Sequence, residues 1–549
     1  MSVVTATVAG SSGVMDPSWE VLSIDVHKEV NRIPWAQIAL LDGDAAKKKF
    51  VISDHAFFEP GQEITIKLRY EGSKLPEVTV FSGLVVRHAV EASEHGMLLT
   101  VELKDKAMVM TRVRESAVYN QKTDSEIITT LIGKYAASKL TKGELAPTSP
   151  AHAEIVQYYC TDWDFMLARA DANGLLVACE NGAVSLGAIK FSGGVNHSFE
   201  FGISEIMNFE IEVDANQQFA EIQTIAWDVA TKKLTQASKA VDFTLRQGNV
   251  SASKVAKLTG GALQTLLDPT PQLPAVGKAW ANGSLIKSRM AMLRGRLSVP
   301  GAGDIHCLDL MEVTGVGKRF NGITMVTGVR HRVDLNGWQT EVQFGLSSAA
   351  ASGRADIQDR PAAGQLPGVN GLQIGVVSDV ADPDGQYRIQ VILPGINEET
   401  GAIWARQALP DAGAGRGYYF RPEPGDEVIV GFFNDDPRQA VILGAMYGPV
   451  NEPAPDMDAA NANNLIKGIM TKKGVKLLFS DDETPKLTLE TPGKNKIVLD
   501  DKGELLELSD KHGNTITMNK SGIKIDSADK LTLSAKGDVE ISGTKVDVK

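Results

Sequence analysis

The C-terminal segment, from Lys472 onward, repeats a short apolar pattern that restricts the fold more than any other feature of the sequence. Each unit holds two apolar residues separated by one other residue, followed by Gly, Asp, Asn, Lys or Ser, which favour tight turns. At steps of 10, 10, 9, 10, 7, 8, 8 and 7 residues, the pairs are Leu477/Phe479, Leu487/Leu489, Ile497/Leu499, Leu506/Leu508, Ile516/Met518, Ile523/Ile525, Leu531/Leu533, Val539/Ile541 and Val546/Val548. One such strand cannot bury its apolar face alone, so the strands must stack. The pattern predicts a β-helical prism of nine strands, which at about 4.8 Å per strand makes a rod on the order of 40 Å long.

The apolar pairs are expected to face the interior of this needle. The interior positions predicted nearest the C-terminus are Ile516, Met518, Ile523, Ile525, Leu531, Leu533, Val539 and Ile541. The repeat fits two kinds of prism equally well. In one, three strands of a single chain close the prism. In the other, each of three chains contributes one strand. The segment has 14 lysines, no arginine and 14 acidic residues, with Phe479 as its only aromatic residue. This balance suits a solvated rod rather than a nucleic-acid groove, and the scarcity of aromatics argues against sugar stacking.

Two stretches of small, polar and Pro/Gly-bearing residues divide the rest of the chain. They are the predicted linkers 351–368 and 451–465, and they separate a hub domain (1–350), a small barrel (369–450) and the spike (466–549). The barrel segment is dense in short strands, with Gly371–Val377, Tyr387–Leu393 and Glu427–Phe433 expected to be three of them. Several strands in about 80 residues, without a long helix, predict a small antiparallel barrel.

The hub segment mixes strand and helix patterns. Gln62–Tyr70 and Met97–Leu103 alternate at period two, as half-buried strands do, whereas Ser125–Leu140 and Asp162–Asn173 have helical spacing. Thr123, Asp124 or Ser125 is the expected cap of the first helix, and Gly174 is placed to end the second.

A weak internal repeat also lies in the hub segment. Arg87-His88-x-Val90-Glu91 and Arg330-His331-x-Val333-Asp334 each lead to a glycine and a period-two strand. We interpret them as equivalent hairpins of two related β-barrels, the alternative being chance similarity between hairpins. The predicted fold class is therefore mainly β, with an α+β hub.

Charge and composition exclude several classes of protein. With 68 acidic and 56 basic residues the net charge is −12, so no general attraction for nucleic acid is expected. Three cysteines give no disulfide framework, and no apolar run of about 18 residues predicts a transmembrane helix. The first 19 residues lack the basic start of a signal peptide, so we expect synthesis and assembly in the cytoplasm.

No constellation of residues predicts a catalytic, cofactor or metal site, and none is expected. Gly413–Gly417 is followed by aromatic residues and prolines rather than a helix, so it is interpreted as a loop and not as a phosphate cradle. His306-Cys307 lacks a second cluster at zinc spacing and is interpreted as a core pair. His88 and His331 are expected to serve hairpin packing. Asp162 and Asp164 are expected to favour a helix start rather than to form a catalytic carboxylate pair.

Three segments, in this order, resemble the VgrG family of spike proteins of contractile injection systems. Lys318–Gly322, Val326–His331 and Gly337–Thr340 resemble the end of the family's hub. Pro422–Phe432 and Asp436–Gly444 resemble its oligosaccharide/oligonucleotide-type (OB) barrel, and the short-period tail resembles its needle. Asn31–Trp35 and Phe58–Gly61 are more similar to the extracellular, phage-tail-like branch, with the type VI secretion branch as the main alternative.

The resemblance implies a homotrimer with a three-chain β-helix needle. Some family members carry an enzyme domain between barrel and needle, but Asn451–Met470 is too short for one, so no enzymatic activity is expected. Two barrels per chain would make a pseudo-sixfold hub that docks on a hexameric inner tube among baseplate proteins, and the needle would puncture a target envelope. It also implies that a PAAR-type tip protein binds Val546, Val548 and Lys549 and that the spike carries effector cargo. The protein would be part of a particle that is released or fired, and it would contact a target membrane only on injection. The rival interpretations are a polysaccharide-binding β-helix protein and a spike with an enzymatic activity for which the sequence offers no site.

Overall fold

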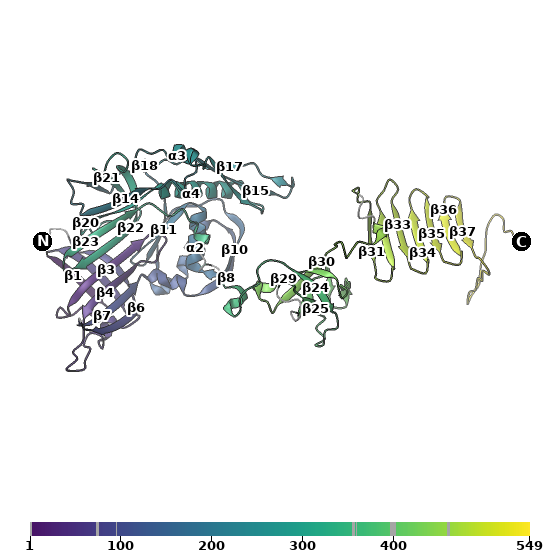
Figure 1. Cartoon of the computed structure of the whole chain (residues 1–549), viewed down its shortest axis with the longest axis horizontal. Coiled ribbons are helices and arrows are strands. Elements are labelled where there is room, and N and C mark those ends of the chain that lie inside the picture. Colours follow the sequence, from purple (N-terminus) through teal and green to yellow (C-terminus); the bar gives the residue numbers. More distant parts are fainter. Residues whose placement is uncertain are drawn as a thin grey trace. The chain divides into compact units, whose positions relative to one another are not determined.

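The computed structural model describes residues 3–72, 76–94, 96–353, 357, 360–395, 402–457 and 462–548, and these form two compact units (Figure 1). The first unit is Met1–Asp359 and the second is Arg360–Lys549. The boundary falls inside the predicted linker 351–368, and the second unit holds both the predicted barrel and the predicted spike. Strands make up 44% of the structure and helices 14%, which confirms the mainly β prediction. None of the described helices is long and apolar enough to cross a membrane.

Within the described residues, one 14-stranded sheet runs through the first unit and contains both of the hairpins from which two related barrels were predicted. Its first half follows the order β3-β4-β7-β6-β5-β1-β2. The strands are β1 (Val4–Gly10), β2 (Gly13–Val14), β3 (Val21–Glu29), β4 (Trp35–Leu41), β5 (Glu63–Tyr70), β6 (Val78–Ser93) and β7 (Gly96–Lys104). Strand β5 alternates as its sequence predicts, with Ile64, Ile66 and Leu68 buried in the core of this half.

The second half of the sheet continues from the first without a break, because β22 pairs with β3. Its strands are β13 (His197–Glu200), β14 (Asn208–Val213), β18 (Arg246–Gln247), β20 (Leu293–Pro300), β21 (Leu310–Thr314), β22 (Gly322–Asp334) and β23 (Gly337–Phe344). At the seam between the halves, the Arg330 guanidinium donates to both carboxylate oxygens of Asp25, at 2.9 and 2.6 Å. A bidentate pair of this kind fixes the register as well as the distance of the two strands.

Both copies of the internal repeat are antiparallel hairpins. In β6–β7 Arg87 lies opposite Glu102, and in β22–β23 Arg330 lies opposite Glu341. Each long strand also contains a bulge, between Val85 and Arg87 in β6 and between Val326 and Gly328 in β22. The hairpins therefore share their cross-strand charge pattern, although their bulges lie at different offsets from the arginine.

Two insertions add the helices of the hub. The first contains β8 (Arg114–Lys122), α1 (Asp124–Gly133), β9 (Thr141–Leu145), β10 (His152–Thr161), α2 (Asp162–Ala172), β11 (Leu175–Glu180) and β12 (Ala183–Ala188). The second contains β15 (Glu221–Asp228), β16 (Lys233–Leu234), β17 (Ser238–Lys239), α3 (Ala252–Leu258), β19 (Leu263–Asp268) and α4 (Pro274–Met292). Figure 1 shows α4 lying along the strands of this second insertion.

Local signals explain the helix boundaries. Thr123 caps α1 in a reciprocal capping box with Glu126, as one of the predicted caps. Helix α1 ends at Gly133, earlier than the predicted Leu140, and a short 3-10 turn (Ala136–Ser138) follows. Gly174 ends α2 with φ +66°, as predicted. It also lies against Gly283 of α4, because a Cβ on Gly283 would be 2.7 Å from the Gly174 nitrogen.

In the second unit, the small barrel is closed by β24 (Gln373–Asp379), β25 (Ile389–Ile392), β26 (Ala402–Gln407), β30 (Ala440–Ala445) and β29 (Glu427–Phe432). Its three predicted strands are confirmed as β24, β25 and β29. The glycine-rich segment Gly413–Gly417 is not a simple loop, because it forms a hairpin of β27 (Ala412–Gly413) and β28 (Arg416–Gly417) tied by an Arg416–Asp411 ion pair.

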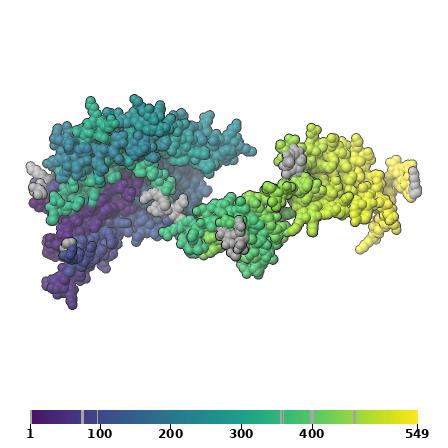
Figure 2. Space-filling view, in the orientation of Figure 1, coloured from purple at the N-terminus to yellow at the C-terminus, as the bar shows by residue number. Residues whose placement is uncertain are grey.

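The repeat segment forms one antiparallel sheet of seven strands within its described residues, and this sheet is open. The strands are β31 (Ile466–Met470), β32 (Lys476–Ser480), β33 (Lys486–Glu490), β34 (Lys496–Asp500), β35 (Leu505–Ser509), β36 (Thr515–Asn519) and β37 (Gly522–Asp526). Six of the nine predicted pairs lie on strands, whereas residues 527–548, which carry the last three pairs, form no strand. Figure 2 shows this last segment, in yellow, outside the body of the sheet.

Candidate assembly surfaces

The needle sheet carries two rows of apolar side chains on one face. The register places Leu499 opposite both Leu487 and Leu506, and Leu508 opposite both Ile497 and Ile516, so the pairs of successive strands line up. The apolar rows are Ile469, Leu477, Leu489, Ile497, Leu508, Ile516 and Ile525, and Phe479, Leu487, Leu499, Leu506, Met518 and Ile523. Because side chains alternate along a strand, the middle residues, such as Thr488, Glu507 and Thr517, point to the opposite face.

These apolar rows are not covered by any part of the chain that the structure describes. Between Ile469 and Met518, seven of their side chains are 38–44% exposed although they lie inside a paired sheet. A row of this length exposes far more apolar surface than scattered surface residues do. The rows are therefore the candidate assembly surface of the needle segment.

The predicted interior residues divide into two groups. Ile516, Met518, Ile523 and Ile525 lie on β36 and β37, where the register brings them together on the face with the apolar rows. Leu531, Leu533, Val539 and Ile541 lie beyond β37, on no strand, and are more than half exposed. Strand β37 pairs only with β36 in the described structure, so its outer edge is free, and residues 527–548 do not extend the sheet from it. Of the predicted tip residues, Val546 and Val548 are exposed, and Lys549 lies outside the described residues.

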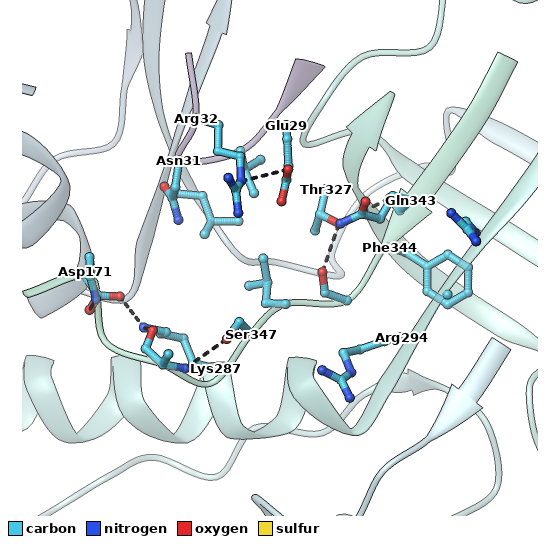
Figure 3. A pocket seen from close by; sticks show the side chains of 18 of the residues that line it. Glu29, Asn31, Arg32, Asp171, Lys287, Arg294, Thr327, Gln343, Phe344 and Ser347 are labelled. Atoms are coloured by element: carbon cyan, nitrogen blue, oxygen red, sulfur yellow. Dashed lines mark hydrogen bonds and ion pairs between the residues drawn. The ribbon is translucent and has the colours of Figure 1, made fainter. Parts of the chain in front are cut away.

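A cavity of about 590 Å³ in the hub was examined as a candidate ligand site (Figure 3). It lies where the segment after β23 passes α2 and α4. Arg32 pairs with Glu29 at 2.9 Å, and Lys287 pairs with Asp171 at 2.6 Å while also donating to the Ala349 carbonyl at 2.7 Å. Figure 3 shows these side chains around the opening.

The charges of this cavity neutralise one another. Its other charged lining residues also form pairs, Arg294 with Glu212 and Arg296 with Glu210. Every charged residue that lines the cavity is described by the structure, and each has an opposite charge as its partner. The arrangement thus anchors the chain segment leaving the hub and leaves no unpaired charged side chain among the described residues that line the cavity.

Among the described residues of the hub's first half, Ser53 and His88 form the hydroxyl–imidazole contact that can be compared with a nucleophile–base pair. Ser53 Oγ lies 2.7 Å from His88 Nε2, but His88 Nδ1 faces the Phe58 carbonyl at 3.1 Å rather than a carboxylate. The Ser53 amide is held by Asp42 at 2.7 Å. This network fixes the segment between β4 and β5, which agrees with a packing role for His88.

His331, the other histidine of the repeat, is completely buried, and its Nδ1 lies 3.0 Å from Thr340 Oγ1. Burial lowers the pKa of His331 to about 3, so the ring is neutral at physiological pH. Its Nε2 has no hydrogen-bond partner in the described structure. A buried and neutral imidazole without access to solvent serves packing rather than proton transfer.

His306 is not part of a core pair with Cys307, contrary to the prediction. The His306 ring is half exposed and its Nδ1 lies 2.9 Å from Glu180, which also accepts from the buried Lys28 at 2.7 Å. Bonding to Glu180 raises the pKa of His306. The pKa of Glu180 falls to about 2 because the bonds from His306 and Lys28 outweigh the cost of its burial. No sequence pattern predicts this network, because its members are far apart along the chain.

The two acids at the start of α2 have different surroundings. The backbone amide of Asp164 donates to Thr161 Oγ1, the helix cap, at 3.1 Å, as expected for a helix start. Asp162 is completely buried and accepts from Lys134, Tyr135 and Gln157 at 2.8–3.3 Å. Asp162 therefore ties α2 to the end of α1, and the two carboxylates do not act as a pair. Across the described residues, no group of three or more His, Cys, Asp or Glu side chains is arranged to hold a metal ion.

Comparison with known families gives matches along the chain. Residues 1–334 match the Alg8 N-terminal domain, residues 373–447 match the type VI secretion system/phage-baseplate injector OB domain, and residues 486–549 match the phage baseplate V C-terminal trimerisation domain. The first match covers most of the hub. The second and third coincide with the closed barrel and with most of the needle segment.

Individual relatives are similar over parts of the chain. The type VI secretion system spike proteins VgrG2a and VgrG2b of Pseudomonas aeruginosa are each 33% identical over 106 residues, which is 18% of this chain but only 13% and 10% of theirs. A tail protein from Neisseria meningitidis is 15% identical, with a TM-score of 0.45 over 65% of this chain and 99% of its own. The prophage MuSo2 43 kDa tail protein from Shewanella oneidensis is 13% identical, with a TM-score of 0.46 over 63% and 99%.

Proposed function

Because this chain belongs to the family of the Alg8 N-terminal domain and is a VgrG-like spike protein of a type VI secretion or phage-tail-like system, we propose that it is the homotrimeric central spike and hub of a contractile injection machine. The observation that carries the proposal is the open needle sheet. Its two aligned rows of apolar side chains lack a cover, and two more copies of the same sheet supply one.

The geometry of this sheet supports a trimer. One sheet with a single apolar face buries that face either against a different layer or against copies of itself. Three such sheets around a threefold axis enclose all their apolar rows in a prism. The opposite faces, which carry Glu507 and Lys524 but also Leu478 and the buried Val498, lie on the outside. The match of residues 486–549 to a trimerisation domain supports the same number of copies.

The hub then adapts a threefold needle to a sixfold tube. Its sheet contains two related hairpins per chain, β6–β7 and β22–β23, and three chains provide six. Duplication of this kind resolves a symmetry mismatch, because six similar elements present six similar contacts to a hexameric inner tube. Baseplate proteins would surround the hub, and contraction of the machine would drive the needle through a target envelope.

The role we propose is mechanical rather than catalytic. It is supported by the paired charges of the hub cavity and by the packing roles of His88 and His331. A PAAR-type tip protein would cover the end of the needle near Val546, Val548 and Lys549, and the spike would carry effector cargo. The chain would be assembled in the cytoplasm and meet a target membrane only on injection.

The branch of the machine is a separate question. We favour an extracellular, phage-tail-like particle, on the residues Asn31–Trp35 and Phe58–Gly61, over a type VI apparatus. Sedimentation of the native assembly separates the two, because released particles pellet from a cleared lysate with their sheath, whereas a membrane-anchored apparatus fractionates with the envelope.

The mass of the purified full-length chain in solution tests the proposal. One chain has a mass of 58.9 kDa, so light scattering on a sizing column should give three times that value, about 177 kDa. A trimer that persists on dilution is the expected result. A folded monomer would contradict the proposal, because its apolar rows would have to be stable in water.

A further inference from the structure

A second hollow of the hub, of about 850 Å³, has a surplus of positive charge, although the whole chain has a net charge of −12. Residues from β3, the turn that follows it, the end of β7, the segment before β8, the bulge of β10 and the start of α2 line this hollow. We call it the basic hollow. Four cationic side chains and two carboxylates line it, and these are Arg32, Lys104, Arg112, Arg114, Glu29 and Asp164.

Two of the four cations have no partner in the part of the chain that the structure describes. Arg32 pairs with Glu29 at 2.9 Å, and the Arg114 guanidinium donates to two backbone carbonyls at 3.2 and 2.9 Å. Lys104 and Arg112 are exposed, and among the described residues their side chains form neither an ion pair nor a hydrogen bond. Two unpaired cations in one hollow attract an anionic group from outside the chain.

Lys104 belongs to a row of side chains that crosses three strands. Trp35 of β4 lies opposite His27 of β3 on one side and opposite Lys104 of β7 on the other. The His27 ring stacks on Trp35 with the ring centroids 4.1 Å apart, so one face of the indole is held in place. Trp35 is nevertheless 37% exposed and lines the hollow. The row therefore places an accessible aromatic ring beside an unpaired ammonium group.

A second aromatic side chain lines the hollow from a strained backbone position. Tyr159 lies in the bulge of β10 with φ +39°, a left-handed conformation that bulky residues rarely adopt. Two hydrogen bonds hold it there, because its N–H donates to Ser116 Oγ at 3.0 Å and its carbonyl accepts from Arg114 Nη1 at 3.2 Å. The Tyr159 side chain is 48% exposed. Strain that the surrounding structure maintains in this way is typical of binding sites.

We propose that the basic hollow binds an acidic segment of another protein. Arg, Tyr and Trp are the residue types that contribute most to the binding energy of protein interfaces, and all three line the hollow. Lys104 and Arg112 would pair with carboxylates, and Trp35 and Tyr159 would pack against the side chains between them. The net charge of −12 disfavours a nucleic acid, whose backbone would also meet the acidic remainder of the chain. The inference concerns one copy of the hub and does not rest on the proposed trimer.

Binding of a defined peptide by the full-length protein tests the inference. The probe is a biotinylated octapeptide of alternating glutamate and phenylalanine on an interferometry sensor, and the control peptide has lysine in place of each glutamate. Because the chain as a whole is acidic, non-specific attraction would favour the basic peptide. We expect the wild type to bind the acidic peptide at least about tenfold more tightly than the basic one.

Paired charge reversals locate the binding. The double variant Lys104→Glu, Arg112→Glu should lose at least about tenfold in affinity for the acidic peptide. The double variant Lys254→Glu, Lys257→Glu makes the same change in charge at exposed positions of α3, outside the hollow, and should stay within about twofold of the wild type. Lys104→Gln with Arg112→Gln is the second variant if the charge reversal in the hollow does not fold.

The opposite outcomes would overturn the inference. They are no binding of the acidic peptide by the wild type, tighter binding of the basic peptide, and equal losses in the two double variants. Tighter binding of a single-stranded oligonucleotide of the same length would assign the hollow to nucleic acid instead. The mass of the same sample keeps the proposed function separate. Binding by a monomer would support the hollow and contradict the spike trimer, and absence of binding at trimeric mass would do the reverse.

Discussion

Replacement of Leu508 by Asp tests the needle most directly. Leu508 lies in the middle of the sheet, on β35, with Ile497 and Ile516 as its cross-strand neighbours. The next residue towards the N-terminus, Glu507, points to the opposite face of the same strand. Leu508→Asp and Glu507→Lys are therefore matched changes in charge, one on each face of the sheet.

The expected loss follows from the exposed fraction of Leu508. Its side chain is 38% exposed in the single sheet, and complete burial of a leucine contributes about 1.5–3 kcal/mol, so closing the prism adds about 1 kcal/mol per copy. The aspartate loses this gain in all three copies. It also buries three carboxylates near one axis, where the effective penalty of burying an unpaired ion is several kcal/mol for each. The trimer should lose at least about 10 kcal/mol at this one layer, which is enough to prevent assembly.

Light scattering and the yield of soluble protein measure the effect. Leu508→Asp should abolish the mass of about 177 kDa, three times 58.9 kDa, whereas Glu507→Lys should retain it. If the sheet remained single and open in solution, Leu508→Asp would cost only the contacts within one sheet, about 1–2 kcal/mol, and the two variants would have the same mass. A soluble Leu508→Asp trimer at wild-type yield would refute the assignment of the interior face.

The other predictions concern the hub and are measured by urea unfolding of the full-length protein, followed by tryptophan fluorescence. Gly283→Ala should lower the free energy of unfolding by about 1–3 kcal/mol, because the added methyl group collides with the backbone of Gly174. Glu180→Gln should lower it by about 1–2 kcal/mol at pH 7, a value reduced for the partial exposure of Glu180. Because folding lowers the pKa of Glu180 from 4.5 to about 2, this contribution is present above pH 4.5 and is lost as the pH falls towards 2, where variant and wild type should converge. Because folding lowers the pKa of His331 from 6.5 to about 3, wild-type stability should fall by about 1.4 kcal/mol for each pH unit below 6.5, and His331→Gln should lack this slope. An unchanged slope in that variant would assign the acid sensitivity to other groups.

Much of the needle could be predicted from its sequence, because a period-two strand has only two faces. The paired apolar residues are enough to set the register of β32 to β37, and turn residues mark the ends of each strand. The strand number could not be predicted from the pattern alone. Leu531, Leu533 and the pairs after them have nearly the same spacing as the pairs on β36 and β37, yet they form no strand although the outer edge of β37 is free, so spacing alone does not decide where the sheet ends.

In the hub, features that depend on neighbouring residues could be predicted from the sequence, whereas contacts between distant residues could not. The cap at Thr123 and the helix end at Gly174 depend on residues within a few positions, so the sequence predicts them closely. The Arg330–Asp25 seam joins residues 305 positions apart, and it merges two predicted barrels into one sheet. The same distance effect explains His306, whose neighbour Cys307 is visible in the sequence but whose real partner, Glu180, is 126 positions away.

The second unit contains two β structures whose strands both alternate between apolar and polar residues. They differ in whether one copy of the chain is enough to bury the apolar residues. The closed barrel pairs every one of its five strands with two neighbours, and its core of Val377, Val430 and Ile442 is complete in one copy. The needle sheet is open, and its apolar rows are complete only in the proposed trimer. The barrel can therefore fold before assembly, whereas folding of the needle beyond β37 and trimerisation become a single event that depends on concentration. This order of folding has a functional consequence in the proposed trimer. If one chain dissociated from the needle, the apolar rows of all three chains would lose their burial.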